Sequence, residues 1–215
     1  MKQLARSFKA ILKRIPAYTH WQLSQQENEY NNWVVAGKPV PPPHRAKQLA
    51  IIEYAKKFGL KTFVETGTYL GDMVAAMQME GVFDNIFSIE LSPQLHGLLQ
   101  YRFSRSKKLH LLQGDSGCVL KEILKEIDQP VVFWLDGHYS SGATSKGVRE
   151  TPIEQELEHI FNHPLRERHV ILIDDARTFT GQADYPTTQY LREFAKMAGY
   201  NSFDIKDDII RILNR

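Results

Sequence analysis

Five short apolar runs, separated by stretches long enough to form helices, restrict the fold of this chain more than any other feature. The runs are Thr62 to Thr66, Ile86 to Glu90, Leu109 to Gln113, Val131 to Leu135 and His169 to Ile173. A strand that is apolar at nearly every position is buried on both faces, and strands separated by helices pair in parallel in a sheet that helices cover on both sides. The pattern therefore predicts an α/β protein with a doubly wound, mostly parallel sheet.

Turn and cap residues between the runs agree with this prediction. Ser92 followed by Pro93 is typical of a helix start, because the serine caps the helix and the proline fits its first turn. The residues from Thr151 to Glu154 match a capping box. Gly59 and Gly199 each follow a stretch of helical period and predict helix ends. The helices expected from this spacing include His44 to Phe58, Asp72 to Met79 and Thr187 to Met197.

The end of the chain predicts a β-hairpin. Two further runs, Ser202 to Lys206 and Ile209 to Leu213, flank the pair Asp207-Asp208. Aspartate is common in tight turns, and short apolar runs on either side of such a pair are typical of paired strands. With this hairpin the predicted strands number seven.

The first 43 residues have a different pattern, and we interpret them as a helical extension that covers the substrate site of a domain over residues 44–215. Met1 to Ile15 has basic residues, no acidic residue and apolar residues at helical spacing, which predicts a basic amphipathic helix. Such a helix packs on its own domain, on a second subunit as in a homodimer, or on an anionic membrane surface. The proline cluster from Pro39 to Pro43 marks the boundary.

Composition argues against several classes of protein. The 215 residues include 27 Lys and Arg against 25 Asp and Glu, a net charge of +2, which disfavours a nucleic-acid partner bound through bulk charge. The lone cysteine, Cys118, excludes an internal disulfide and a cysteine zinc site. The sequence has no apolar run of about 18 residues, so no integral membrane segment is expected. A cytoplasmic location is the expectation.

Acidic residues and glycines follow three successive strands, at the edge where parallel strands end. The turn from Glu65 to Gly71 follows the first strand, Glu90 ends the second, and Gly114-Asp115-Ser116 follows the third. Glycines before a helix let a ligand approach the backbone, and a carboxylate at the second strand can accept both hydroxyl groups of a ribose. Asp115 can accept from an adenine amino group. The first turn has two glycines where a dinucleotide fingerprint needs three, which disfavours a nicotinamide oxidoreductase.

Together with Leu135-Asp136-Gly137, these motifs resemble those of the class I S-adenosylmethionine (SAM)-dependent methyltransferases, over roughly Lys47 to Arg215. The resemblance implies a Rossmann-like, seven-stranded sheet whose last strand is antiparallel, with SAM as the cofactor. Thr66 and Thr68 depart from the family, in which many members have Gly or Ala, and they narrow the first turn. The resemblance places Glu65, Gly67, Gly71, Glu90 and Asp115 at the cofactor. Further candidate cofactor contacts are Thr68, Ser116 and Asp136.

Carboxylates also follow the fourth and fifth strands. Asp136 and the pair Asp174-Asp175 are expected at the same edge of the sheet, where they would repel one another unless a cation or a proton joined them. Oxygen ligands without cysteine favour Mg²⁺ or a similar divalent cation. In this respect the chain resembles the metal-dependent small-molecule and sugar O-methyltransferases. The alternative is that the aspartate pair caps a helix and holds no metal.

The residues after Asp136 are expected to contact the methyl acceptor. The connection to Thr151 is longer than the usual span of about two to six residues, and long connections tend to carry function. His138, with an ordinary pKa of about 6.5, is the candidate general base, with Asp136 beside it. Candidate substrate contacts are Tyr139, Ser140 and Arg177.

The sequence therefore predicts a methyltransferase that transfers the methyl group of SAM to a hydroxyl of a small molecule or sugar, with a divalent cation and with His138 as general base. One alternative is a metal-independent enzyme that relies on His138 alone. Another is a non-catalytic nucleotide-binding module. A nucleic-acid substrate is disfavoured, because no Asn/Asp-Pro-Pro-aromatic motif follows the fourth strand and no strongly basic face is evident.

Overall fold

A seven-stranded mixed sheet forms the centre of the protein. The computed structural model describes residues 16–136 and 151–214. Within these residues the strands follow the order β3-β2-β1-β4-β5-β7-β6. Strands β1 to β5 pair in parallel, and β7 is antiparallel to both β5 and β6. The strands are β1 (Thr62–Thr66), β2 (Asn85–Glu90), β3 (Leu109–Gln113), β4 (Val131–Leu135), β5 (Val170–Ile173), β6 (Ser202–Lys206) and β7 (Ile209–Leu213).

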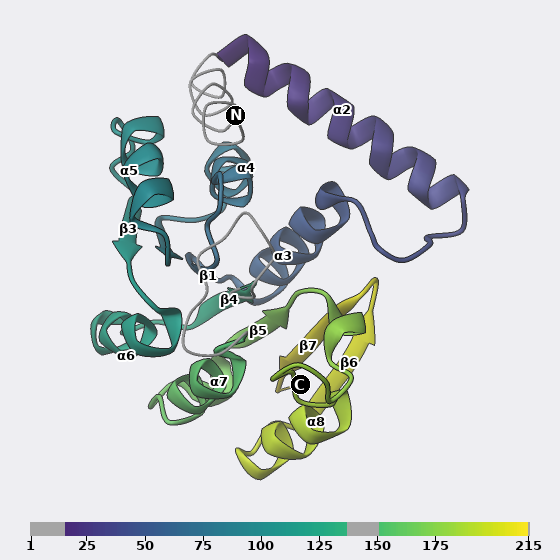
Figure 1. Ribbon diagram of the computed structural model, residues 1–215, viewed down its shortest axis with the longest axis vertical. Coiled ribbons are helices and arrows are strands. Elements are labelled where there is room, and N and C mark those ends of the chain that lie inside the picture. Colours follow the sequence, from purple (N-terminus) through teal and green to yellow (C-terminus); the bar gives the residue numbers. More distant parts are fainter. Residues whose placement is uncertain (1–15, 137–150, 215) are drawn as a thin grey trace.

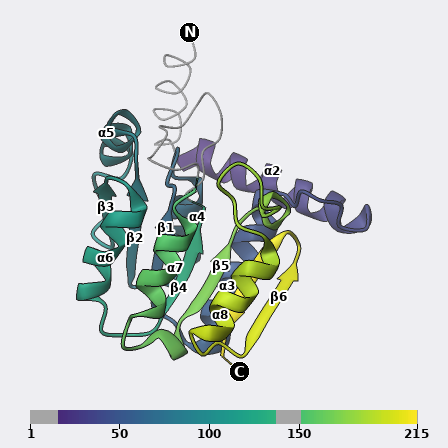
Figure 2. The ribbon, with the colours of Figure 1, turned by 60° about the horizontal axis from the view of Figure 1, so that its bottom comes forward.

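Helices cover both faces of this sheet (Figures 1 and 2). Helices α3 and α4 pack on one face and α6, α7 and α8 on the other. Helix α5 lies beside α4, and α2 packs against α3 and extends away from the sheet (Figure 1). This is the doubly wound, Rossmann-like architecture that the sequence predicts. The helices are α2 (Pro16–Val35), α3 (His44–Phe58), α4 (Asp72–Glu80), α5 (Pro93–Arg102), α6 (Ser116–Glu126), α7 (Ile153–Phe161) and α8 (Thr188–Met197), with short 3₁₀ helices η1 (Arg166–Arg168) and η2 (Ala176–Thr178).

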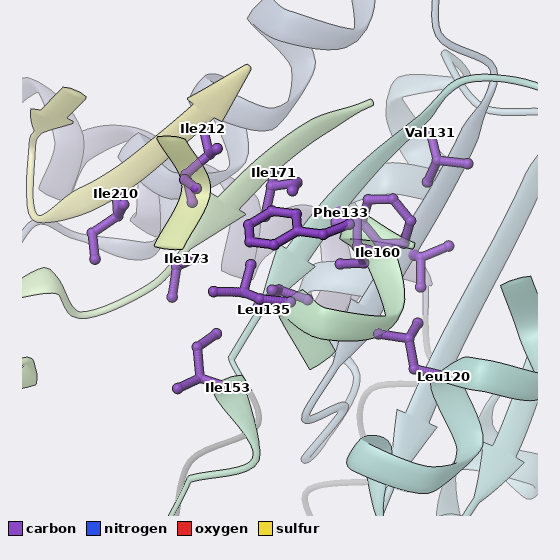
Figure 3. Packing of buried hydrophobic residues seen from close by; sticks show 14 of the residues in the cluster. Leu120, Val131, Phe133, Leu135, Ile153, Ile160, Ile171, Ile173, Ile210 and Ile212 are labelled. Atoms are coloured by element: carbon purple, nitrogen blue, oxygen red, sulfur yellow. The ribbon is translucent and has the colours of Figure 1, made fainter. Parts of the chain in front are cut away.

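Strands β4 and β5 are apolar at every position because both of their faces are buried. Along β4, Phe133 and Leu135 point into the cluster beneath α6, α7 and α8, while Val132 and Trp134 point into the cluster beneath α3 and α4. Phe133 is aligned with Ile171 of β5, and Figure 3 shows these two side chains at the centre of the first cluster. Alternation of side chains along a strand thus supplies both cores.

Local signals in the sequence explain where the elements begin and end. The Ser92 hydroxyl oxygen accepts a hydrogen bond from the Leu95 N–H at 3.3 Å and caps α5, as predicted. Gly59 ends α3 with a φ of 64°. Asp207 and Asp208 have φ values of 53° and 60°, the conformation that a two-residue hairpin turn requires at both of its central positions.

The capping box predicted at Thr151 is wrong in detail. Helix α7 begins at Ile153, with Pro152 as the residue that precedes it and no side-chain cap. The Thr151 hydroxyl oxygen instead accepts from the Ile153 N–H at 3.3 Å. The threonine therefore lies one position before the residue that precedes the helix, but its hydroxyl still satisfies the N–H of the first helical residue.

The amino-terminal predictions are only partly addressed. The basic amphipathic helix predicted for Met1 to Ile15 lies outside the described residues, and the domain boundary at residue 43 stays a prediction. No helix in the described part of the chain is long and apolar enough to cross a membrane.

A pair of histidines at the amino end of β5 makes folding sensitive to acid. The Val131 N–H donates to Nδ1 of His169 at 3.1 Å, so His169 carries its proton on Nε2, which lies 2.8 Å from Nδ1 of His163. Burial, then the charges of His163 and Arg168, lowers the pKa of His169 to about 3. His169 therefore stays neutral in the native state at pH values where the unfolded chain protonates it, below about pH 6.5.

We expect His169→Gln to lower stability at pH 8 but to weaken the loss of stability on acidification. The wild-type protein should lose up to about 1.4 kcal/mol per pH unit more than the variant between about pH 6.5 and pH 3. Urea unfolding at a series of pH values measures this difference. His44→Gln, at an exposed position, is the matched control. Parallel pH curves for His169→Gln and the wild type would contradict the neutral state of His169.

Candidate active site

The predicted site residues gather at the carboxyl edge of the sheet, around the point where the strand order reverses. Strands β1 and β4 are neighbours there, and Thr66 is aligned with Leu135. The Asp136 N–H donates to the Thr66 carbonyl oxygen at 3.2 Å, so the two strand ends are joined. In open α/β sheets, ligands bind beside the carboxyl ends of the strands at such a switch point.

The turn after β1 bends sharply and is held by the neighbouring strand. Gly67 and Tyr69 have φ values of 84° and 51°. The N–H groups of Gly67 and Thr68 both donate to the Ile89 carbonyl oxygen, at 3.0 and 3.1 Å. Because these amide groups already have partners in β2, the turn does not present them to a phosphate group, in agreement with the missing dinucleotide fingerprint.

Gly71 is required by packing. Its φ is 76°, and a Cβ atom there would lie 2.6 Å from Cε2 of Phe103 and 2.8 Å from Cδ2 of Leu99. A side chain at residue 71 would therefore force the ends of the Leu99 and Phe103 side chains to move. The role at the cofactor that the sequence predicts for Gly71 stays a prediction.

Glu90 is held by the backbone at the end of β2. Its Oε2 accepts from the Tyr69 N–H and its Oε1 from the Ser92 N–H, both at 2.8 Å. Burial raises the pKa of Glu90, and these two hydrogen bonds oppose the shift. A carboxylate has about four acceptor positions, so two backbone donors leave capacity for two hydroxyl groups. Binding of a ribose by Glu90 stays a prediction.

Glu65, in β1, is buried next to its neighbour strand β2. The Ser88 hydroxyl donates to Glu65 Oε2 at 2.5 Å, and the Thr68 hydroxyl oxygen lies 2.6 Å from that of Ser88. Burial raises the pKa of Glu65 well above its ordinary value, and the charges of Asp136 and Glu90 add to the effect. A buried chain of hydroxyl groups therefore joins Glu65 to Thr68, and through it to the turn after β1.

Asp115 caps the helix that follows β3. Its Oδ1 accepts from the Gly117 N–H at 2.9 Å. This contact explains an acid at the start of α6 without a ligand, so the predicted contact with adenine stays a prediction. Ser116 is buried beside it.

Glu156 is a candidate site residue that we did not predict from the sequence. It lies in the first turn of α7, is 1% exposed, and its Oε1 has no hydrogen-bond partner among the described residues. Burial raises the pKa of Glu156 to about 7, although hydrogen bonds from Ser116 and Thr66 lower it. Ile153, Leu157 and Ile160 lie on the same side of α7. A signal was therefore present, since an acid on the apolar face of a helix is unusual.

The predicted metal ligands Asp174 and Asp175 bind a lysine. Nζ of Lys47, from α3, lies 2.6 Å from Asp174 Oδ2 and 3.0 Å from Asp175 Oδ1. Burial lowers the pKa of Lys47, but the two carboxylates raise it further, so the side chain is a cation at neutral pH. Burial and the charge of Asp136 raise the pKa of Asp174, and Lys47 opposes them.

These contacts do not fit the magnesium site predicted at Asp136, Asp174 and Asp175. The ammonium group of Lys47 already lies between the two neighbouring carboxylates, where a bridging cation would bind. Within residues 16–136 and 151–214, no group of three or more His, Cys, Asp or Glu side chains is arranged to hold a metal ion. The charge that balances the aspartates in this arrangement comes from the chain itself, from Lys47.

The remaining predictions concern the methyl acceptor. Arg177 forms ion pairs with Asp175, at 3.0 Å, and with Asp208. The backbone N–H of Arg177 also donates to Asp208 Oδ1 at 2.9 Å, so Arg177 joins the end of β5 to the hairpin turn. A contact between Arg177 and substrate stays a prediction. His138, Tyr139 and Ser140 lie outside the described residues.

Solved structures share this fold. A candidate caffeoyl-CoA O-methyltransferase from Staphylococcus aureus superposes with a TM-score of 0.56 at 14% identity, over 91% of this chain and 99% of that one. The S-adenosylhomocysteine (SAH)-bound methyltransferase PaMTH1 from Podospora anserina gives 0.52 at 18% identity, over 79% and 78%. The O-methyltransferase from Bacillus cereus in complex with SAH gives 0.52 at 14% identity, over 89% and 91%. No family model and no curated protein sequence matches the chain.

The chain therefore has the Rossmann-like fold of class I SAM-dependent methyltransferases, with the antiparallel last strand that the sequence predicts. Identities this low establish the fold but leave the reaction and the substrate open.

We expect Gly71→Ala to destabilise the protein more than Gly81→Ala. Both glycines have positive φ values, 76° and 65°, but a Cβ at position 81 meets nothing within 4 Å. The difference in unfolding free energy isolates the clash with Phe103 and should be about 1 to 3 kcal/mol, measured by urea unfolding. Equal losses for the two variants would mean that packing does not require a glycine at position 71.

We expect Glu156→Gln to change how stability depends on pH. The native pKa of about 7 lies above the ordinary value of 4.5, so folding is favoured with Glu156 protonated, and this contribution is lost as the pH rises from 4.5 through 7. Between pH 4.5 and pH 8, unfolding free energies should shift in favour of the variant by about 3 kcal/mol. Glu158→Gln, exposed on the same helix, should shift nothing. A constant difference between Glu156→Gln and the wild type would refute the raised pKa.

Proposed function

We propose that this protein is a SAM-dependent methyltransferase that methylates a hydroxyl group of a small molecule or sugar. The observation that carries the proposal is the carboxylate of Glu90. Two backbone N–H groups hold it at the end of β2, and two acceptor positions remain for the hydroxyl groups of a ribose. The fold supports the same proposal, because solved methyltransferases share it and two of those described above hold SAH.

In the proposed reaction, bound SAM supplies an electrophilic methyl group. Glu90 binds the ribose, and the turn after β1, held by Ile89, lies beside it. Asp136 lies at the switch point of the sheet, next to the acceptor. We propose that His138 takes the proton of the acceptor hydroxyl as the methyl group is transferred, which is general-base catalysis at an ordinary histidine pKa.

We favour the metal-independent form of this reaction. A divalent cation would have to displace Lys47 from Asp174 and Asp175, at distances of 2.6 and 3.0 Å, and would have to remove a buried positive charge. For the acceptor, the small net charge of +2 supports a small molecule over a nucleic acid.

We expect purified protein to bind SAH, and Glu90→Gln to weaken that binding by about 10- to 100-fold, because the amide is neutral and keeps only one acceptor oxygen for the backbone N–H groups and the ribose hydroxyl groups. Isothermal titration calorimetry measures the affinity, with NAD as a ligand that should give no heat. Glu126→Gln, at an exposed position, is the control.

The proposal fails if SAH gives no heat with the wild type. Unchanged affinity in Glu90→Gln removes Glu90 from the cofactor site. If SAH binds but labelled SAM transfers no methyl group to any of a panel of phenols, catechols and sugars, the non-catalytic module replaces the enzyme. Turnover that EDTA abolishes would favour the metal-dependent form.

A further inference from the structure

The contact between Lys47 and the two aspartates joins distant parts of the chain. Lys47 lies in α3, before the first strand, and its partners follow the fifth strand, 127 and 128 residues later. Lys47 and Asp174 are 8% and 4% exposed. The lysine therefore reaches across the edge of the sheet, and its ammonium group is nearly removed from water where the carboxyl ends of the strands meet.

A contribution to stability alone explains this arrangement poorly. Removing a lysine and an aspartate from water costs more than an apolar pair of the same size would, and their mutual attraction often only offsets that cost. The site needs a cation for another reason. The charge of Asp136 acts on Asp174, and Asp175 is its direct neighbour, so three acids at this edge would repel one another without a positive charge.

We propose that Lys47 is a resident cation that replaces a divalent metal at this edge of the sheet and binds the acceptor oxygen. An ammonium group has three N–H donors, and Asp174 and Asp175 engage two of them. The third donates to the hydroxyl oxygen of the acceptor and favours loss of its proton to the general base. The O–CH₃ bond then forms as the S–CH₃ bond of SAM breaks. The contact with the acceptor rests on the proposed function, whereas replacement of the metal rests on the ion pairs alone.

The first test is metal binding, which requires neither SAM nor an acceptor. We titrate the full chain with MnCl₂ by calorimetry and follow free Mn²⁺ by electron paramagnetic resonance. Wild type should bind no Mn²⁺ at the aspartates. Lys47→Met removes the cation with little change of shape, and it should bind Mn²⁺ at least about tenfold more tightly than wild type. Adding Asp174→Asn to Lys47→Met should abolish that gain, and Lys56→Met, exposed on the same helix, should gain nothing.

Two results would overturn the replacement of a metal by Lys47. One is Mn²⁺ binding by wild type that Asp174→Asn removes, because the aspartates would then take a metal while Lys47 is present. The other is a folded Lys47→Met that binds no Mn²⁺. If Lys47→Met does not fold without metal, thermal unfolding with and without Mn²⁺ decides: Mn²⁺ should raise the melting temperature of this variant and leave that of wild type unchanged.

The second test concerns the acceptor and uses turnover. Wild-type activity should be insensitive to EDTA. Lys47→Met should lose turnover while its affinity for SAH is unchanged, and Mn²⁺ should restore part of the lost activity. Lys47→Arg, which keeps the charge, should retain more activity than Lys47→Met. Restoration by neither Mn²⁺ nor arginine would refute a role as the cation at the acceptor. Absence of SAH binding in wild type would instead refute the proposed function and leave the Mn²⁺ result standing.

Discussion

The parallel pairing of β1 with β4 is the constraint on which the rest of the structure depends. The chain reverses the direction in which it adds strands between β1 and β4, and their aligned ends Thr66 and Leu135 lie at the carboxyl edge of the sheet. Every candidate residue described above follows one of the strands that end at this edge or packs against it. The pairing in turn depends on burial of both faces of β4, where Phe133 and Trp134 supply opposite cores.

Concentrating acids at one edge creates an electrostatic problem that the protein solves differently at each position. Backbone N–H groups bind Glu90, and a serine hydroxyl binds Glu65. Asp115 is satisfied by the start of a helix. The aspartates after β5 receive full positive charges from Lys47 and Arg177. In the reaction that we propose, these charges lie beside the acceptor hydroxyl that loses a proton.

The sequence predicted the strands almost to the residue, because short, mostly apolar runs separated by segments of helix length are typical of a parallel sheet. The sequence also located Glu90, since an acid that ends a parallel strand lies at the carboxyl edge of the sheet. The prediction failed where two interacting residues are far apart in the sequence. Nothing around Lys47 distinguishes it from other lysines of an amphipathic helix, and only the folded chain brings it to Asp174. The divalent cation was predicted from the three aspartates alone, without the lysine that lies beside two of them. Glu156 was missed because its helix was predicted from the residues at its start and not from the apolar face on which Glu156 lies.

The ion pair between Arg177 and Asp208 in the hairpin turn affects the order in which the site forms during synthesis. Chains emerge from the ribosome amino end first, and domains generally fold as units. The residues around Glu90 have all their partners once β1, β2 and the start of α5 have emerged. The contacts of the aspartates after β5 are complete only once the last strands have emerged. Lys47 joins Asp174 and Asp175 to α3, and Arg177 joins Asp175 to the final hairpin. A chain stopped shortly before residue 207 would carry both Lys47 and Arg177, but Arg177 would lack Asp208, the residue that ties it to the final hairpin.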